Sequence, residues 1–248
     1  MSGLTEGQSQ RSRKLLWGVF GMFLFMIGDW LLDAAGAGDV EVGLAVHSNW
    51  ETMALWRFVA SAVIALVAIF PVWPAAQEAM ATSRENTRAG KAASRFWNKA
   101  FQWGQVILVA FGAGFHAIIC MFPLFFKEAV ALGGGIELAT QLVNATASQI
   151  IIPLLLLYIL CDAGISIAWY YLVCSRELHV GIWALLCCPL STLLIDFLLK
   201  MIPLQFFKDF TVAFESLGWL LMYAALAVHA RKTTATVSRP HQHGSECC

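Results

Sequence analysis

Charged residues are scarce in this sequence of 248 residues. They make up 13% of it, against about 25% in a typical soluble domain. Hydrophobic residues make up 59%, and the mean hydropathy is +0.69. A water-soluble fold of this length cannot bury so many apolar side chains, so lipid must solvate much of its surface. We therefore expect an all-α, polytopic integral membrane protein whose main partner is the lipid bilayer.

A basic excess is also missing, since 16 Lys and Arg balance 16 Asp and Glu, and nucleic acid is therefore not an expected partner. The sequence lacks a C-x-x-C pair, an H-E-x-x-H motif, a G-x-S-x-G elbow and a phosphate-binding loop. We accordingly expect no metal site and no cofactor. Five of the seven cysteines fall inside or at the ends of apolar stretches, where cysteine behaves as a small apolar side chain.

Long apolar stretches are what the sequence does contain. Six of them are long enough to be helices that cross a bilayer, for which about 20 residues are needed. They cover about 15–33, 53–73, 103–126, 148–173, 181–200 and 211–229. Together they predict a six-helix transmembrane domain over residues 15–230.

Polar segments flank and interrupt this domain. Residues 1–14 end in three basic residues and are expected to form a disordered arm. Residues 75–102 carry five Lys and Arg and predict a solvated basic loop, helical at most in part. Residues 231–248 are expected to form a disordered tail.

The first apolar stretch has a second interpretation, a cleaved signal peptide. A basic segment precedes it, and Ala35-Gly36-Ala37 resembles a cleavage site of small residues. Asp29 and Trp30 argue against cleavage, because they fall where a signal peptide should be apolar. We therefore favour a retained first span.

The basic residues predict the orientation of the six spans. With the N-terminus in the cytoplasm, twelve of the sixteen Lys and Arg fall on the cytoplasmic side. Three fall outside, namely Lys127, Lys200 and Lys208, and Arg57 lies in or near the membrane. This asymmetry follows the positive-inside rule and predicts that both termini are cytoplasmic. The cytoplasmic membrane of a bacterium is the expected location, with a eukaryotic endomembrane as the alternative.

Ionisable residues inside the predicted spans gather toward the extracytoplasmic side. Because a charge near the bilayer centre costs a few kcal/mol, such groups face the bundle interior or water and seek partners. We expect a cluster around Arg57 that lines a cavity or an ion pathway, with His116 and Asp162 at greater depth as a proton relay. The candidate residues are Asp29, Arg57, His116, Asp162, Asp196 and Glu215, with Asp33, Asn144 and Lys200 as secondary members.

Several of these residues also have purely structural interpretations. Arg57 has a side chain long enough to reach the lipid headgroups. Asp196 and Lys200 are four residues apart and so able to pair with each other on one helix. Glu215 falls in the first turn of its helix, where an acid favours the helix dipole.

Three functional hypotheses follow. The first is a small transporter, or a protein that binds a solute or lipid, with an outward-opening polar cavity. The second is a non-catalytic structural or partner subunit, with its oligomeric state left open. The third is an integral-membrane enzyme acting on a lipid, with His116 and a carboxylate as acid and base. A Ser–His–Asp arrangement built from Ser61 or Ser166, His116 and an acid also stays open.

Glycines mark one expected helix contact. Gly18, Gly21 and Gly28 form a thin stripe on the first span. Since small residues let helix backbones approach closely, we expect a neighbouring helix to pack against this stripe.

Overall fold

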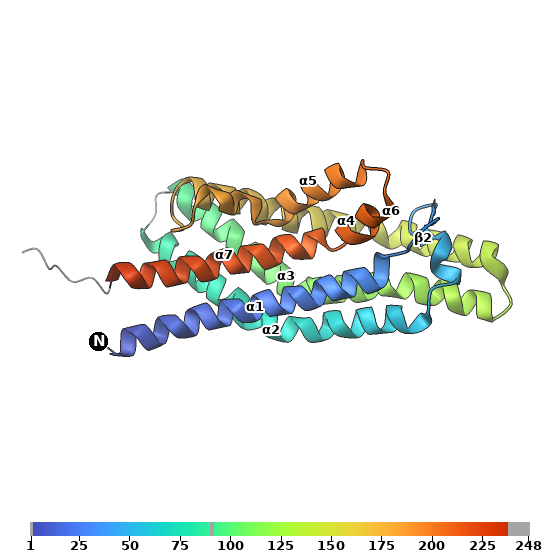
Figure 1. The fold of residues 1–248 in the computed structure, drawn as a ribbon, viewed down its shortest axis with the longest axis horizontal. Helices are drawn as coiled ribbons and strands as arrows, with labels where there is room; N and C mark the ends of the chain where they lie inside the picture. Colours follow the sequence, from blue (N-terminus) through green and yellow to red (C-terminus); the bar gives the residue numbers. More distant parts are fainter. Residues whose placement is uncertain (1, 90–91, 238–248) are drawn as a thin grey trace, which may run out of the picture.

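The computed structural model describes residues 2–89 and 92–237 and is an elongated helical bundle (Figure 1). Its elements follow the chain in this order: α1 Ser2–Asp33, β1 Glu41–Val42, β2 Val46–His47, the 3-10 helix Ser48–Glu51, α2 Leu55–Ala89, α3 Ala92–Ala131, α4 Gly135–Cys174, the 3-10 helix Ile182–Leu186, α5 Pro189–Lys200, α6 Gln205–Thr211 and α7 Phe214–Val237. The two strands form one small antiparallel hairpin, in which Glu41 pairs with His47.

The described residues contain four helices that are long and apolar enough to cross a membrane. A fifth span is counted if α6 and α7 are taken together, since the two helices are bent by 50° at the break between them. The protein is therefore an all-α membrane protein. The structure does not confirm the predicted number of six spans.

The difference lies in the predicted span 181–200. This stretch is divided into a short 3-10 helix and α5, which has 12 residues. At 1.5 Å per residue α5 is about 18 Å long, well short of the roughly 30 Å of a bilayer core. Pro189 stands at the start of α5, where its missing N–H costs nothing. Residues 181–200 are apolar almost throughout, but the helix is interrupted before Pro189.

The predicted arm and loop also differ from what the structure shows. Residues 2–14 belong to α1, and most of residues 75–102 belong to the ends of α2 and α3. Three alanines in this part of α2 are fully buried: Ala75, Ala76 and Ala79. Pro71 and Pro74 lie inside α2 and do not end it. Of the predicted tail, residues 231–237 continue α7, and residues 238–248 lie outside the described part.

Ion pairs explain why the first turns of the chain remain attached to the bundle. Arg11 bonds to Glu78 at 2.5 Å and to Glu85 at 2.9 Å, both on α2. Lys14 lies 3.6 Å from the other carboxylate oxygen of Glu78. The basic residues that predicted a free arm instead connect α1 to α2.

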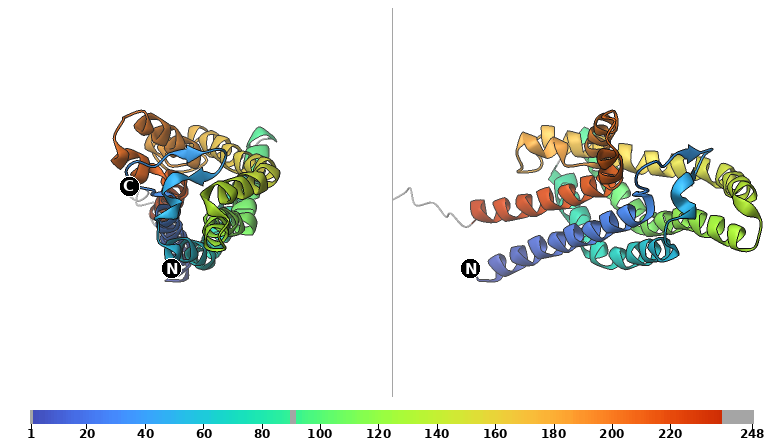
Figure 2. Two further views of the ribbon diagram at one scale, coloured as in Figure 1. Left: turned by 90° about the vertical axis from the view of Figure 1, so that its right-hand side faces the viewer. Right: turned by 45° about the vertical axis from the view of Figure 1, so that its right-hand side comes forward.

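Neighbouring helices run up and down the long axis of the bundle (Figure 1). α1 packs against α2 and α7, α2 packs against α3, and α3 packs against α4. The described ends of the chain, at α1 and α7, lie at the same end of the bundle, and the turn between α3 and α4 lies at the opposite end (Figures 1 and 2).

The glycine stripe of α1 is a close helix contact, as expected. A Cβ added to Gly18 would lie 2.4 Å from the Cβ of Ala75 on α2, and one added to Gly21 would lie 2.6 Å from Val72. Gly28 faces the ring of His116 on α3. The stripe therefore sets the position of α1 against both helices.

The loop between α1 and α2 holds the small hairpin and the first 3-10 helix. Its centre is Asp39, which accepts hydrogen bonds from the Asn49 amide at 3.0 Å and the Ser48 hydroxyl at 3.4 Å, and contacts His47 Nδ1 at 2.6 Å. Burial alone would raise the pKa of Asp39, but the bonds from Asn49 and His47 outweigh it and lower the pKa below its ordinary value.

The Asp39 carboxylate should stabilise this loop at neutral pH. Because its pKa is lowered by folding, the contribution is complete above the ordinary Asp pKa of about 4 and is lost as the pH falls through the lowered value. We expect Asp39→Ala to speed hydrogen exchange at the Asn49 amide by about tenfold at pH 7. Glu41→Ala, an exposed change in the same hairpin, is the control. Unchanged exchange in Asp39→Ala would contradict this account.

Candidate functional site

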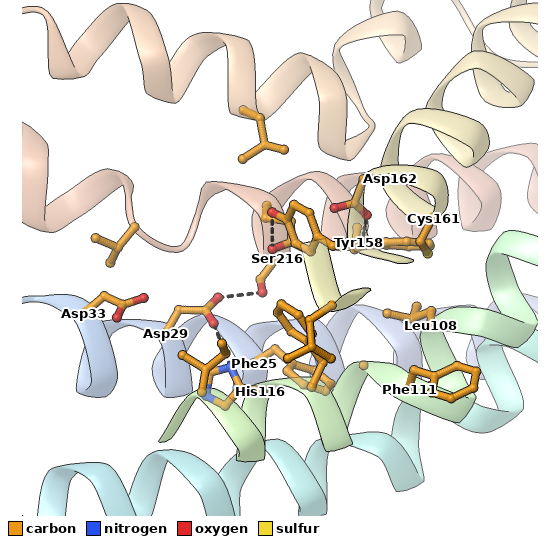
Figure 3. Close-up of a pocket in the computed structure, with 18 of the residues that line it drawn as sticks. Phe25, Asp29, Asp33, Leu108, Phe111, His116, Tyr158, Cys161, Asp162 and Ser216 are labelled. Atoms are coloured by element: carbon orange, nitrogen blue, oxygen red, sulfur yellow. Dashed lines mark hydrogen bonds and ion pairs between the residues drawn. The ribbon is translucent and has the colours of Figure 1, made fainter. Parts of the chain in front are cut away.

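A cavity of about 450 Å³ lies between the second half of α1, the middle of α3 and α4, and the start of α7. Its wall comes from α1, α3, α4 and α5, from the end of α6 and from the start of α7. Most of the wall is apolar, but seven ionisable side chains that the sequence singles out also line it: Asp29, Asp33, His116, Asp162, Asp196, Lys200 and Glu215. Figure 3 shows Asp29 and His116 together on one side of the cavity and Asp162 on the other, each from a different helix.

On one side of the cavity, Asp29 of α1 meets His116 of α3. His116 Nδ1 lies 3.2 Å from Asp29 Oδ1, and the Ser216 hydroxyl of α7 donates to Asp29 Oδ2 at 2.6 Å (Figure 3). Asp29 thereby connects three helices. The exposed fractions of the Asp29 and His116 side chains are only 16% and 10%, so this pair is held in a largely dehydrated place.

The second ring nitrogen of His116 determines where the protons lie. His116 Nε2 is 2.7 Å from the Ser61 oxygen, and the Ser61 hydroxyl donates to the Gly28 carbonyl at 2.8 Å. With the Ser61 proton committed to Gly28, Nε2 must carry the hydrogen of the bond to Ser61. Nδ1 and Asp29 then share one further proton, either as an ion pair or as a neutral acid and imidazole.

Ser61, His116 and Asp29 stand in the order of a Ser–His–Asp triad. Ser61 is fully buried and is not part of the cavity wall. A nucleophile must contact its substrate, and this hydroxyl is enclosed among α1, α2 and α3. Ser61 therefore holds the His116 ring in place. Of the three residues, only His116 and Asp29 line the cavity.

On the opposite side of the cavity, α4 and α7 are joined by two parallel hydrogen bonds. Tyr158 donates to Glu215 Oε2 at 2.8 Å, and one helical turn further along Trp219 donates to Asp162 Oδ1 at 3.2 Å. Each helix supplies one donor and one carboxylate, four residues apart. The arrangement places the Asp162 and Glu215 carboxyls close enough to interact.

One carboxylate oxygen in this group has no donor. Asp162 is 4% exposed, and its Oδ2 receives no hydrogen bond from the described residues. A buried polar atom without a partner is costly, so such an atom in a cavity wall needs an explanation. Glu215 is its neighbour, but two carboxylates cannot bond to each other unless one holds a proton.

Asp33, Asp196 and Lys200 form a further group of ionisable residues at the cavity. Lys200 Nζ bonds to Asp196 Oδ2 at 3.0 Å, so the structural pairing that their spacing indicated is present. Both residues also line the cavity. Asp196 Oδ1 is a second buried oxygen without a partner among the described residues.

Arg57 is not the centre of the cluster, contrary to the sequence-based expectation. Its guanidinium donates to the backbone carbonyls of Trp30 at 3.2 Å and Ala34 at 2.8 Å, and it does not line the cavity. Carbonyls at the end of a helix lack intrahelical partners and attract cations. Arg57 therefore caps α1, and neither Asp29 nor Asp33 pairs with it.

Asn144 is also outside the cavity. Its Oδ1 accepts from the Leu44 amide at 2.8 Å, and its Nδ2 donates to the Val42 carbonyl at 3.0 Å. The side chain anchors the small hairpin to α4. Sequence reasoning in turn missed Tyr158, Ser216 and Trp219, although two of them lie four residues from a predicted site acid.

The chain belongs to a family of unknown function, DUF6796. The family model matches residues 7–233, which include every residue of the cavity wall. No curated protein and no solved structure matches the chain. The family membership supplies no activity.

The capping role of Arg57 gives a test of how the site is built. Arg57→Ala removes two charge-assisted bonds to the end of α1, and we expect a loss of about 1 kcal/mol in the free energy of unfolding. For a chain of this size that loss lowers the unfolding temperature by about 2–4 °C. Arg95→Ala, an exposed position on α3, is the control. Equal stability of the two variants would show that Arg57 does not cap α1.

Proposed function

We propose that this protein binds a small molecule or a lipid in the cavity and moves it into or across the membrane, as a small transporter or carrier. The observation that carries the proposal is the cavity itself. Its volume of about 450 Å³ falls in the range of small-molecule sites, and its mostly apolar wall with a few converging polar groups is typical of them. Five of the six principal candidate residues face it.

Two large apolar side chains in the cavity wall are half-exposed. Phe111 of α3 and Leu155 of α4 line the cavity and are 52% and 50% exposed, and we infer that the cavity opens to the lipid beside them. A ligand with an apolar body thus has a route from the bilayer. This supports a ligand that partitions into membranes over one confined to water.

The orientation is part of the proposal. We infer that both termini are cytoplasmic and that the cavity lies in the extracytoplasmic half of a bacterial cytoplasmic membrane. The support is the concentration of Lys and Arg in the segments at the terminal end of the bundle.

An enzyme acting on a lipid is a second candidate, and the pairing of His116 with Asp29 favours it. A histidine held by an acid at 3.2 Å inside a cavity has the geometry of a general acid or base. The two functions differ in one observable. A carrier leaves its bound molecule unchanged, whereas an enzyme alters its mass.

A cavity-filling substitution tests the proposed function. Gly112 lines the cavity, whereas a Cβ added to Gly114, two residues away on α3, meets open space. We expect Gly112→Leu to abolish the rise in unfolding temperature caused by eight-carbon probes (1-octanol and octylammonium), and Gly114→Leu to retain it. The measurement is thermal unfolding followed by tryptophan fluorescence, with mass spectrometry of the recovered probe. The proposed function fails if neither probe stabilises the unaltered protein.

A further inference from the structure

We propose that the ligand of this cavity is an amphipathic ammonium, a single positively charged amine with N–H donors on an apolar body. This inference rests on the proposed function and names the chemical class of its ligand. It follows from the hydrogen-bonding capacity and the charge that the cavity wall leaves unused.

The donors of the wall are already committed. Each neutral donor side chain that lines the cavity has an acceptor within the protein. The pairs are Tyr158 with Glu215, Trp219 with Asp162, Ser216 with Asp29, Thr211 with the Phe207 carbonyl, Cys161 with the Gly104 carbonyl, and His116 with Ser61 and Asp29. A ligand that needs donors from the protein, such as a carboxylate or a phosphate, finds none of these groups free.

Acceptors remain in excess. Each carboxylate offers about four lone-pair sites, and five carboxyl groups line the cavity. Asp162 is the clearest case, since the residue is 96% buried and lines the cavity. Its Oδ2 receives no hydrogen bond from an N–H or hydroxyl of the described residues, and the neighbouring group is the Glu215 carboxyl, which bonds to it only when one of the two acids holds a proton. A ligand that carries its own N–H groups can donate hydrogen bonds to these unused acceptor oxygens.

The charges of the wall point the same way. Against five carboxyl groups stand one lysine and one histidine, and Lys200 is already paired with Asp196. An uncompensated negative charge in a dehydrated site is costly, and a bound cation offsets that cost. When no ligand is bound, protons on some of the acids reduce the negative charge instead. Protons and the cation therefore compete for the same carboxyl groups.

An organic cation fits better than a metal ion. Among the described residues, no three His, Cys, Asp or Glu side chains converge as metal ligands would. The aromatic rings of Phe115 and Tyr158 are stacked at 5.6 Å beside the carboxyls, and Phe25 and Phe111 add further apolar surface. An ammonium group between the acids would pair with the carboxyl groups, and its apolar chain would pack along the aromatic rings.

A free amine and an amine-bearing lipid headgroup share this chemistry. The phosphate of a zwitterionic lipid would bring an anion beside the carboxyls, and no neutral donor side chain of the wall is left to bind it. The geometry therefore favours a free amphipathic amine over phosphatidylethanolamine.

The test compares probes of equal chain length on the purified full-length protein in nanodiscs. The probes are octylammonium, octyltrimethylammonium, 1-octanol and octyl sulfate, and the readout is the unfolding temperature as a function of probe concentration. We expect octylammonium to bind at least about tenfold more tightly than 1-octanol, which corresponds to one charge-assisted bond. Octyltrimethylammonium, which has charge but no N–H, should rank between them, and octyl sulfate should not bind.

Two substitutions locate the binding. Asp162→Asn and Glu215→Gln remove one charge each without changing size, and each should weaken octylammonium binding at least about tenfold while leaving 1-octanol binding unchanged. Asp162→Asn also supplies an N–H beside Glu215, so we expect it to fold and to unfold at an equal or higher temperature without probe. Glu137→Gln, on the exposed face of α4, is the matched control.

The outcomes separate the two proposals. Equal binding of octylammonium and 1-octanol, or full octylammonium binding in both cavity variants, overturns the ammonium assignment and leaves the cavity-binding function standing. Failure of all four probes contradicts the proposed function as well. Nanodiscs with and without phosphatidylethanolamine distinguish the sources. If that lipid alone stabilises the protein and octylammonium then adds nothing, the ammonium chemistry holds and its source is the lipid headgroup.

Discussion

Carboxyl groups inside an apolar helix bundle are the constraint on which the rest of this structure depends. A charge placed there costs free energy unless hydrogen bonds, a counterion or a proton compensates it. The protein meets that cost unevenly. Asp29 is held by Ser216 and His116, and Glu215 by Tyr158, whereas one oxygen of Asp162 has no partner among the described residues. An architecture whose only purpose was stability would more easily place an apolar residue there.

The packing of the helices positions these acids and their hydrogen-bond partners. The glycine stripe on α1 allows α2 to approach, so that Ser61 of α2 reaches the Gly28 carbonyl and the ring of His116. Ser61 and Asp29 then fix the imidazole from its two sides. The bend between α6 and α7 falls just before Glu215, which lets the first turn of α7 face the cavity while its remainder packs on α1.

The sequence predicted much of this, and its errors have physical causes. Apolar stretches indicated the membrane class, and the cost of buried charge indicated which side chains gather around the cavity. Arg57 was placed wrongly because side-chain charges were considered without the carbonyls at the end of α1, which bind it. The span 181–200 was wrong because composition does not reveal the break before Pro189. Ser61 was named only as an alternative to Ser166, since an isolated hydroxyl in an apolar helix has no pattern that shows which histidine it contacts; the structure pairs it with His116.

We propose that the acidic cavity lies within the membrane and is accessible from the side opposite the termini. The most direct test of this central claim is the reactivity of Leu193→Cys, a position in the cavity wall on α5, in a variant whose native cysteines are replaced by alanine. We expect a membrane-impermeant trimethylammonium methanethiosulfonate, added to the side opposite the termini, to react with Leu193→Cys at least about tenfold faster than its sulfonate analogue, because the acidic wall attracts the cationic reagent. Leu194→Cys, 60% exposed and outside the cavity wall, should react with neither. Equal rates for the two reagents at Leu193→Cys, or no reaction from that side, would contradict the account.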